Sequence, residues 1–338
     1  MRVRVAISGV NGYGGRELMR LCLAHPGFEV AAVYGESTVG QPVSHLFPAL
    51  VGHPAGELVV QPFAPEEVDA DLLFASLPTG ASREPLARVA RDVKIVDVGG
   101  DHRYAEGWVY GLTELPGTRE AIRASSRVAD PGCYAATSLL ALAPLVANGL
   151  IEVEGIVVDA KSGISGAGRG GGSGYTFAET NEDVVPYGLL WHDHVREMSE
   201  TLSRLAGGGR RASVAFTPHL IPMTRGIVST CYGRPRGSLT TAEVVAKARA
   251  FYADEPFIRV REVQQTWTKT GSGAHSKWTT GTNLAFLTYA VNAQTGHVVA
   301  VGATDNLGKG AAGQAVQNAN LMTGQPETAG LTGTPLWP

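Results

Sequence analysis

The chain has 338 residues and a formal net charge of −3, from 28 basic and 31 acidic residues. This length predicts about two domains. The charge balance excludes the basic surface that binding to nucleic acid or to an anionic membrane requires. Three cysteines are too few for a disulfide framework and favour a reducing compartment. We find no secretory signal and no apolar run of the roughly 18 residues that a membrane span needs, so we expect a cytoplasmic protein.

The first part of the chain alternates short apolar runs with helical patterns. Runs at 3–7, 28–34, 71–76 and 94–98 predict strands, and apolar residues recur at helical spacing over 18–22. Such alternation predicts a Rossmann-like α/β domain with a parallel sheet. Ligands of these sheets bind where the strands end, which here means segments 9–15, 76–82 and 99–103.

Glycines stand at positions 9, 12 and 15, between the first predicted strand and the first predicted helix. They let the backbone turn sharply and approach a pyrophosphate, which the helix N-terminus then binds. We therefore predict a dinucleotide site at this turn. The residues leave the cofactor type open, because Glu36 favours the ribose hydroxyl of NAD, whereas Ser37 and Thr38 suit the 2′-phosphate of NADP.

The pattern changes near residue 150. Strands of a mixed or antiparallel sheet are predicted at 151–160, 212–218, 226–233, 284–291 and 297–302. Helices are predicted at 240–251 and 311–322. We expect a dinucleotide-binding domain over 1–150 plus 305–338, and a second domain of α+β class over 151–304.

Cys133 is the candidate nucleophile. It follows the turn residues Pro131 and Gly132 and precedes a helical pattern over 135–148. A helix N-terminus lowers the pKa of a thiol and favours the reactive thiolate. Cys22 and Cys231 lie instead in apolar stretches, where cysteines usually behave as small hydrophobic side chains.

A thiolate that attacks a carbonyl carbon needs an acid/base partner. Among nine histidines, His219 lies at the end of a predicted strand, in a loop that Pro218 and Pro222 restrict. Spacing alone does not separate it from a packed or surface histidine.

A glycine-rich loop spans residues 161–175. It carries Lys161, Ser162, Ser165 and Arg169 among glycines that expose backbone N–H groups. This composition predicts either a cradle for an anionic group or a flexible loop.

These segments resemble the N-acetyl-γ-glutamyl-phosphate reductase family, a relative of aspartate-semialdehyde dehydrogenase. The resemblance covers nearly the whole chain. Its motifs occur in the same order, at 9–15, 97–103, 131–134, 162–169, 179–182, 192–197, 217–226 and 305–322. It implies an NADPH-dependent reduction of an acyl phosphate through a thioester on Cys133, assisted by His219, with release of phosphate. It also implies a substrate and oligomerisation role for the second domain, and a homodimer or homotetramer.

The resemblance assigns further residues. Substrate contacts are expected from Arg103, Ser162, Arg169, Glu179, His192 and His194. Cofactor contacts, for NADP(H), are expected from Gly9, Gly12, Tyr13, Gly15, Ser37, Ser76, Leu77, Pro78, Gly163 and Asn306. No metal is expected.

Two other functions stay open. A branch of the same family reduces aminoadipyl phosphate carried on a small acidic protein in lysine biosynthesis, and Arg169, Arg210 and Arg211 are candidates for a basic rim that would receive such a carrier. The other alternative is a dinucleotide sensor without catalysis, in which Cys133 would be unreactive.

Overall fold

The structure is a computed structural model that describes residues 2–170, 172–263 and 273–336. The chain forms two compact units. The first unit comprises residues 1–131, 168–170 and 311–333, and the second comprises 132–167, 171–310 and 334–338. These bounds differ from the division expected at 150 and 305, because residues 132–150 and 305–310 lie in the second unit.

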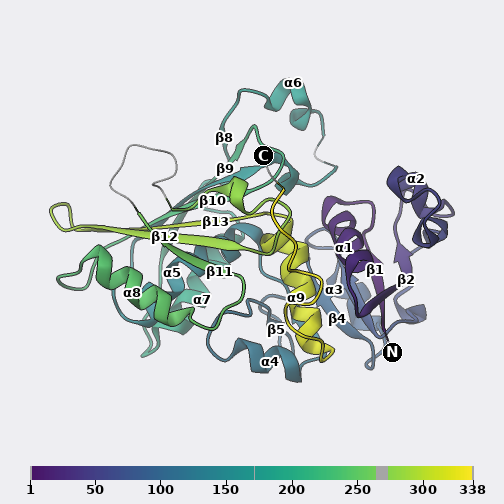
Figure 1. Cartoon of the computed structure of the whole chain (residues 1–338), viewed down its shortest axis with the longest axis horizontal. Coiled ribbons are helices and arrows are strands. Elements are labelled where there is room, and N and C mark those ends of the chain that lie inside the picture. The colour runs from purple at the N-terminus through teal and green to yellow at the C-terminus, as the bar shows by residue number, and fades with distance from the viewer. Residues whose placement is uncertain (1, 171, 264–272, 337–338) are drawn as a thin grey trace. The chain divides into compact units, whose positions relative to one another are not determined.

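A six-stranded parallel sheet forms the centre of the first unit, in the order β2-β1-β3-β4-β6-β5 (Figure 1). Its strands are β1 (Val3–Ser8), β2 (Phe28–Tyr34), β3 (Leu72–Ala75), β4 (Lys94–Asp97), β5 (Val109–Tyr110) and β6 (Arg127–Ala129). All four residues of β3 are fully buried, as in a strand that is covered on both faces. The predicted parallel α/β domain is confirmed.

Helices accompany this sheet. They are α1 (Tyr13–Ala24), α2 (Val43–Leu46), α3 (Arg83–Arg88), α4 (Thr118–Ala124) and α9 (Gly313–Met322). Every residue of α9 is buried, and the helix packs against α1, α4 and β4. Its amides are hydrogen-bonded: Gln314 donates to the carbonyl oxygen of Gly111 at 2.8 Å, and Asn318 donates to Asp130 at 3.0 Å. These bonds fix the returning end of the chain in the first unit.

The predicted strand, glycine turn and helix are present at β1 and α1. Gly9 has a φ of 76°, and a Cβ there would lie 2.0 Å from the carbonyl oxygen of Ser76. A Cβ on Gly15 would lie 2.2 Å from the carbonyl oxygen of Gly9. The turn closes this tightly only because both positions lack a side chain.

A seven-stranded mixed sheet forms the second unit, in the order β11-β12-β13-β10-β7-β9-β8. Its strands are β7 (Ile156–Gly163), β8 (Val185–Pro186), β9 (Val214–Ile221), β10 (Ile227–Gly233), β11 (Ile258–Glu262), β12 (Ala285–Asn292) and β13 (His297–Thr304). Its helices are α5 (Cys133–Ala147), α6 (Phe177–Thr180), α7 (His194–Ala206) and α8 (Thr241–Phe251). Because α5 contacts α7, α8 and four of the strands, these three helices cover one face of the sheet.

Most predicted elements of this half are present, with shifted ends. The strand expected at 151–160 begins at Ile156 and runs to Gly163, into the segment expected to be a loop. Gly163, the last residue of β7, pairs with Ile221 of β9, and its N–H donates to the carbonyl oxygen of Gly226 at 2.9 Å. Helix α7 and strand β11 were not predicted.

Helix α5 is the core of the second unit. Every residue from Tyr134 to Val146 is buried. A helix with apolar residues on every side requires packing on every side, and α5 has it. Burial of each leucine contributes roughly 1.5–3 kcal/mol. Two hydroxyl pairs cross from the helix to the sheet: Thr137 to Thr304 at 2.6 Å and Ser138 to Ser229 at 2.7 Å.

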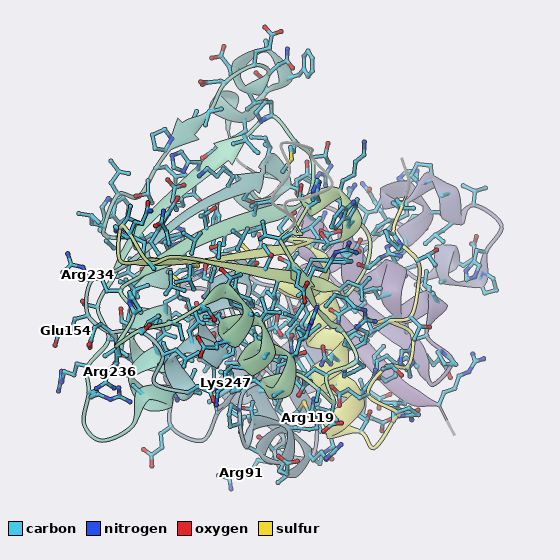
Figure 2. All side chains as sticks on the ribbon, turned by 60° about the vertical axis from the view of Figure 1, so that its left-hand side comes forward. Arg91, Arg119, Glu154, Arg234, Arg236 and Lys247 are labelled. Carbon is cyan, nitrogen blue, oxygen red and sulfur yellow. The ribbon has the colours of Figure 1, made fainter. Side chains whose placement is uncertain are left out.

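Charges of both signs are interspersed on the surface of the second unit. Figure 2 shows Glu154, Arg234 and Arg236 pointing outward at one end of it. The backbone of this end is paired, with the amide of Glu152 donating to the carbonyl of Arg234 at 2.8 Å, and Arg236 lies 3.5 Å from the Glu152 carboxylate. These arginines therefore do not form a stripe of a single sign. Within the described ranges, no helix combines the length and the apolar character needed to cross a membrane.

The glycine turn allows a direct test of steric fit. Gly9→Ala adds both a positive-φ penalty and a clash with Ser76, whereas Gly40→Ala, at a φ of 81° with no atom within 4 Å, adds the φ penalty alone. We expect Gly40→Ala to cost roughly 1–2 kcal/mol and Gly9→Ala clearly more. Urea unfolding of both variants measures the difference. Equal losses of stability would contradict the tight closure of the turn.

Candidate active site

Cys133 is the first residue of α5 and is partly exposed, whereas Cys22 and Cys231 are buried. Burial raises the pKa of Cys231 to about 12 and raises that of Cys22 well above its ordinary value. A Cβ on Gly310 would lie 3.0 Å from the Cβ of Cys133, so the chain after β13 passes directly against the nucleophile. Of the three thiols, Cys133 alone has access to a ligand, as predicted from its position.

Two residues of α7 reach the N-terminus of α5. The backbone N–H of Gly132 donates to the Glu197 carboxylate at 2.8 Å, and Glu197 is 1% exposed. The other carboxylate oxygen lies 4.0 Å from Nε2 of His194. A Cβ on Gly132 would lie 2.0 Å from the same Nε2, so the imidazole lies against the backbone immediately before Cys133.

Aromatic side chains enclose this end of α5. The Tyr134 hydroxyl donates to the carbonyl oxygen of His219 at 2.8 Å and lies 3.4 Å from the Tyr187 hydroxyl. The ring of His192 lies 4.5 Å from that of His194 and packs edge-on against Tyr134. Burial raises the pKa of Tyr187 to about 12 and that of Tyr134 further, so both phenols remain protonated at neutral pH.

The structure does not support the predicted pairing of His219 with Cys133. In β9, His219 is in register with Lys161 of the neighbouring β7, and neighbours in register share a face of the sheet. Its imidazole lies 3.6 Å from Asp159 and 3.3 Å from the carbonyl of Ala160. Helix α5 covers the opposite face, where Ser138 bonds to Ser229. The backbone oxygen of His219 accepts a hydrogen bond from Tyr134 of α5 at 2.8 Å.

The predicted anion loop is divided between these two faces. Lys161 pairs with Asp159 on the face away from α5. Ser162 is buried on the α5 face, where its hydroxyl interacts with the phenol of Tyr134. Ser165 accepts a hydrogen bond from the amide of Asn306 at 2.9 Å. The first five residues of the predicted loop, 161–165, are therefore held by polar contacts.

Asn306 and Asp305 join several segments at the end of β13. The amide oxygen of Asn306 accepts from the N–H of Gly226 at 2.7 Å. Asp305 is fully buried and accepts from the Arg225 guanidinium at 3.0 Å. A Cβ on Gly163 would lie 2.8 Å from the backbone of Thr224, so two segments of the chain approach closely at this predicted site residue.

The first unit holds eight of the ten predicted cofactor residues, whereas Gly163 and Asn306 lie in the second unit. A Cβ on Gly14 would lie 2.7 Å from the Ser76 hydroxyl, so the glycine turn and the Ser76–Pro78 segment meet. The Asn11 amide donates to Ser37 at 3.0 Å and to Thr38 at 2.9 Å. The glycine turn and the segment after β2 thus form one surface, which fits a dinucleotide.

The remaining predicted substrate residues, Arg103, Arg169 and Glu179, lie in three separate segments of the chain. Arg103 donates to the carbonyl oxygen of Asp130 at 3.0 Å, three residues before Cys133 in the chain. Arg169 donates to the carbonyl oxygen of Asn11 at 3.3 Å, within the first unit. Glu179 is exposed on α6. Among the described residues, no group of three or more His, Cys, Asp or Glu side chains is arranged to hold a metal ion.

Sequence reasoning gave no role to Glu197, Tyr134 or Tyr187. For Glu197 a signal was present: His194 and Glu197 are three residues apart, a spacing that places both on one face of a helix. This spacing is informative only if the segment is known to be a helix, and the sequence pattern did not predict α7.

Comparison with known proteins agrees with this division. Residues 4–125 match the family model described as semialdehyde dehydrogenase, NAD binding domain, and residues 133–306 match the semialdehyde dehydrogenase dimerisation domain. The first unit therefore carries a nicotinamide-dinucleotide-binding domain. Chains of known structure share the fold: aspartate semialdehyde dehydrogenase II from Vibrio cholerae, complexed with ASA, has a TM-score of 0.73 at 15% identity and covers 96% of this chain and 98% of its own. The Candida albicans aspartate semialdehyde dehydrogenase with NADP has a TM-score of 0.70 at 16% identity, covering 96% and 99%.

Sequence relatives are much more similar. A protein from Bradyrhizobium sp. (strain ORS 278) named N-acetyl-gamma-glutamyl-phosphate reductase is 53% identical over 339 residues and spans 100% of both chains. One of the same name from Moorella thermoacetica is 40% identical over 352 residues, covering 97% of this chain and 98% of its own. With both domain models matched and such identity over the full length, the chain belongs to the N-acetyl-γ-glutamyl-phosphate reductase family of the semialdehyde dehydrogenase superfamily.

Proposed function

We propose that the chain reduces N-acetyl-γ-glutamyl phosphate to N-acetylglutamate semialdehyde with NADPH and releases phosphate, a step of arginine biosynthesis. The observation that carries the proposal is the placement of Cys133. It is a partly exposed thiol at the first residue of a buried helix, with His194 and Glu197 held beside it. Full-length relatives that carry this enzyme's name support the substrate.

The first half-reaction forms a thioester. The Cys133 thiolate attacks the acyl carbon, the new S–C bond forms, the C–O bond to phosphate breaks, and phosphate leaves with its electron pair. The first backbone N–H groups of a helix have no acceptor within the helix, so those of α5 are available to the developing oxyanion. Arg103 stays a ligand of the leaving phosphate that the family resemblance predicts.

The second half-reaction releases the aldehyde. When bound, NADPH supplies a hydride to the thioester carbon, which turns the thioester into a thiohemiacetal. The S–C bond then breaks, and Cys133 leaves as a thiolate. Hydride addition leaves an oxyanion on the substrate, and an acid/base group that donates a proton to this oxygen takes the same proton back as the S–C bond breaks and the aldehyde forms.

We assign the acid/base role to His194. Its Nε2 lies against Gly132, the residue before Cys133, whereas the His219 imidazole lies on the other face of the sheet. Glu197 is a positioning residue, because its carboxylate is held by the N–H of Gly132 and lies near the same imidazole. Tyr134 and Tyr187, which remain protonated, complete the enclosure as neutral donors.

The position of the basic residues favours the small acetylated substrate over a carrier-bound one. Arg210 bonds to the carbonyl oxygen of Ala206 at the end of α7. This helix has 13 residues and therefore spans about 18 Å, with His194 at its other end. Within the second unit, Arg210 therefore lies at the far end of α7 from His194 and adds no basic rim beside Gly132.

We also propose that the chain forms a homodimer through its second unit. One face of the seven-stranded sheet is covered by α5, α7 and α8, while Val157 and Tyr232 on the other face are 41% and 39% exposed. An open face of this kind is a suitable surface for a second copy. The match to the dimerisation-domain model supports this use.

Cysteine labelling tests the nucleophile. Brief iodoacetamide treatment at pH 7 is expected to modify Cys133 and to spare Cys22 and Cys231, whose thiols are buried and whose pKa values are raised. Peptide mass spectrometry gives the extent at each cysteine, and Cys133→Ser is the control. Labelling of Cys22 with Cys133 protected would favour the non-catalytic sensor.

Two histidine variants test the acid/base assignment. His194→Asn is expected to lower kcat by about 10²–10⁴-fold, as the loss of a general acid/base does. His219→Asn should change kcat less than about threefold, since its imidazole faces away from α5. The measurement is the steady-state rate of NADP reduction, with melting temperatures to confirm folding. The reverse order of effects would restore His219 as the partner.

The reverse reaction tests the substrate. With phosphate and NADP, N-acetylglutamate semialdehyde should react with a kcat/KM roughly 10- to 200-fold higher than its one-carbon-longer analogue, the usual discrimination for one methylene. Absorbance of the reduced cofactor reports both rates. A preference for the longer analogue would indicate the aminoadipyl branch, and no absorbance change with either compound would overturn the proposed function.

A further inference from the structure

Residues 175–191 of the second unit, here called the arm, carry an exposed apolar surface. Of the fourteen large hydrophobic side chains that are exposed in the described part of the chain, seven belong to the arm: Tyr175, Phe177, Val184, Val185, Leu189, Leu190 and Trp191. Phe177 and Trp191 are 81% and 79% exposed. In Figure 1, α6 of the arm projects from the sheet. So many apolar side chains on one short segment indicate a surface that a partner covers.

The backbone of the arm is strained. Within the described ranges, the non-glycine residues with a positive φ are Glu182 at 63° and Leu190 at 64°, and both lie in the arm. A bulky residue keeps such a conformation only where its surroundings hold it. Leu190 is 67% exposed, and its N–H donates to the carbonyl oxygen of Phe216 over a long 3.4 Å. We therefore expect further contacts to this segment from outside the chain.

The arm is also acidic. It contains Glu179, Glu182 and Asp183, all exposed, and no Lys or Arg. An apolar surface bordered by carboxylates favours a partner surface that carries basic groups.

A surface of that kind lies at the opposite edge of the same sheet. Arg259 and Arg261 are exposed on β11, and the guanidinium of Arg261 lies over the ring of Trp278, 5.2 Å from the ring centre. Arg261 is in register with Thr288 of β12, and the register continues through β13 and β10 to Asp159 of β7. Residues in register share a face, so these arginines lie on the face away from α5, which is the face proposed for the second copy.

One copy cannot bring the arm and these arginines together. Strand β8, within the arm, and β11 are the two outermost strands of the seven-stranded sheet (Figure 1), and six strand spacings separate them by roughly 29 Å. In a face-to-face dimer whose two-fold axis runs along the strands, the β8 edge of one copy lies over the β11 edge of the other. The acidic and basic surfaces then meet twice in each dimer.

We propose that in the homodimer the arm of each copy packs against the β11 edge of the other copy, with its carboxylates beside Arg259 and Arg261. The inference rests on the proposed function, because it specifies how the proposed homodimer is built. It also links the dimer to the active site. Tyr187 of the arm lies 3.4 Å from the hydroxyl of Tyr134, and the residue after the arm is His192. The contact between copies thus holds the segment that encloses the start of α5.

A charge exchange tests this inference in the full chain. The arm is reversed by Glu179→Lys, Glu182→Lys and Asp183→Lys together, and the edge by Arg259→Glu and Arg261→Glu together. Each set alone is expected to raise the dissociation constant of the dimer by about 10- to 100-fold, because like charges then face each other. Both sets combined should return it to within about threefold of the wild type. Analytical ultracentrifugation over a range of concentrations measures the constants.

Matched controls separate this contact from a general effect of charge. Lys247→Glu reverses a charge on α8, which covers the other face of the sheet, and should leave the dissociation constant within about twofold. Phe177→Asp should raise it by about 30-fold or more, as the loss of a central aromatic contact does. Val51→Asp, at a side chain of the first unit that is 74% exposed, should not. In the arm variants, activity per chain should rise with protein concentration as dimers form.

The outcomes separate this inference from the proposed function. Unchanged dissociation constants, or weakening without recovery in the combined variant, would overturn the inference, and a dimer that Tyr232→Asp dissociates would still stand. Arm variants that stay dimeric but lose activity would place the arm on its own copy and overturn the inference as well. A wild type that stays monomeric would overturn both the homodimer and the arm contact. The expected constants in a chain that reduces no acyl phosphate would support the inference and count against the proposed reductase alone.

Discussion

The burial of α5 on every side is the constraint on which the rest of the second unit depends. A helix with no exposed face has one position relative to its neighbours, because any rotation or translation opens a void or creates an overlap. Its first residue is Cys133, so the packing of a long apolar core fixes the location of a reactive atom at its edge. The strain-free, partly exposed thiol is thus a consequence of core packing, and no separate structure is needed to hold it.

Short-range patterns were sufficient to predict the glycine turn and four of the six strands of the first unit, and to place Cys133 at the start of a helix. The glycine turn is a local feature, since its sterics involve β1, α1 and the end of β3, each readable as an apolar run or a helical repeat. The position of Cys133 after Pro131 and Gly132 is equally local. The domain boundary could not be read in the same way, because whether α5 belongs to one sheet or the other depends on which surface covers it.

The acid/base partner and the position of Arg169 depend on long-range placement. His219 has the residue type that the chemistry needs, but the alternation of β9 directs its imidazole to the face away from α5, and the face of a strand cannot be chosen without knowing the register. His194 and Glu197 reach Gly132 across more than sixty residues of chain, through a helix that was not predicted. Arg169 lies in a glycine-rich loop of the second half, yet the fold returns it to the first unit.

The hydroxyl pairs between α5 and the sheet determine the register of the nucleophile. Thr137 and Ser138 each meet one hydroxyl on the sheet, Thr304 and Ser229, within an otherwise apolar interface. Apolar contacts alone tolerate a helix displaced along its axis, but a shift of one turn, about 5.4 Å, would break both hydroxyl pairs at roughly 0.5–1.5 kcal/mol each. Apolar burial therefore stabilises the packing of this helix against the sheet. Its few polar contacts fix its position along its own axis, and with it the position of the Cys133 sulfur.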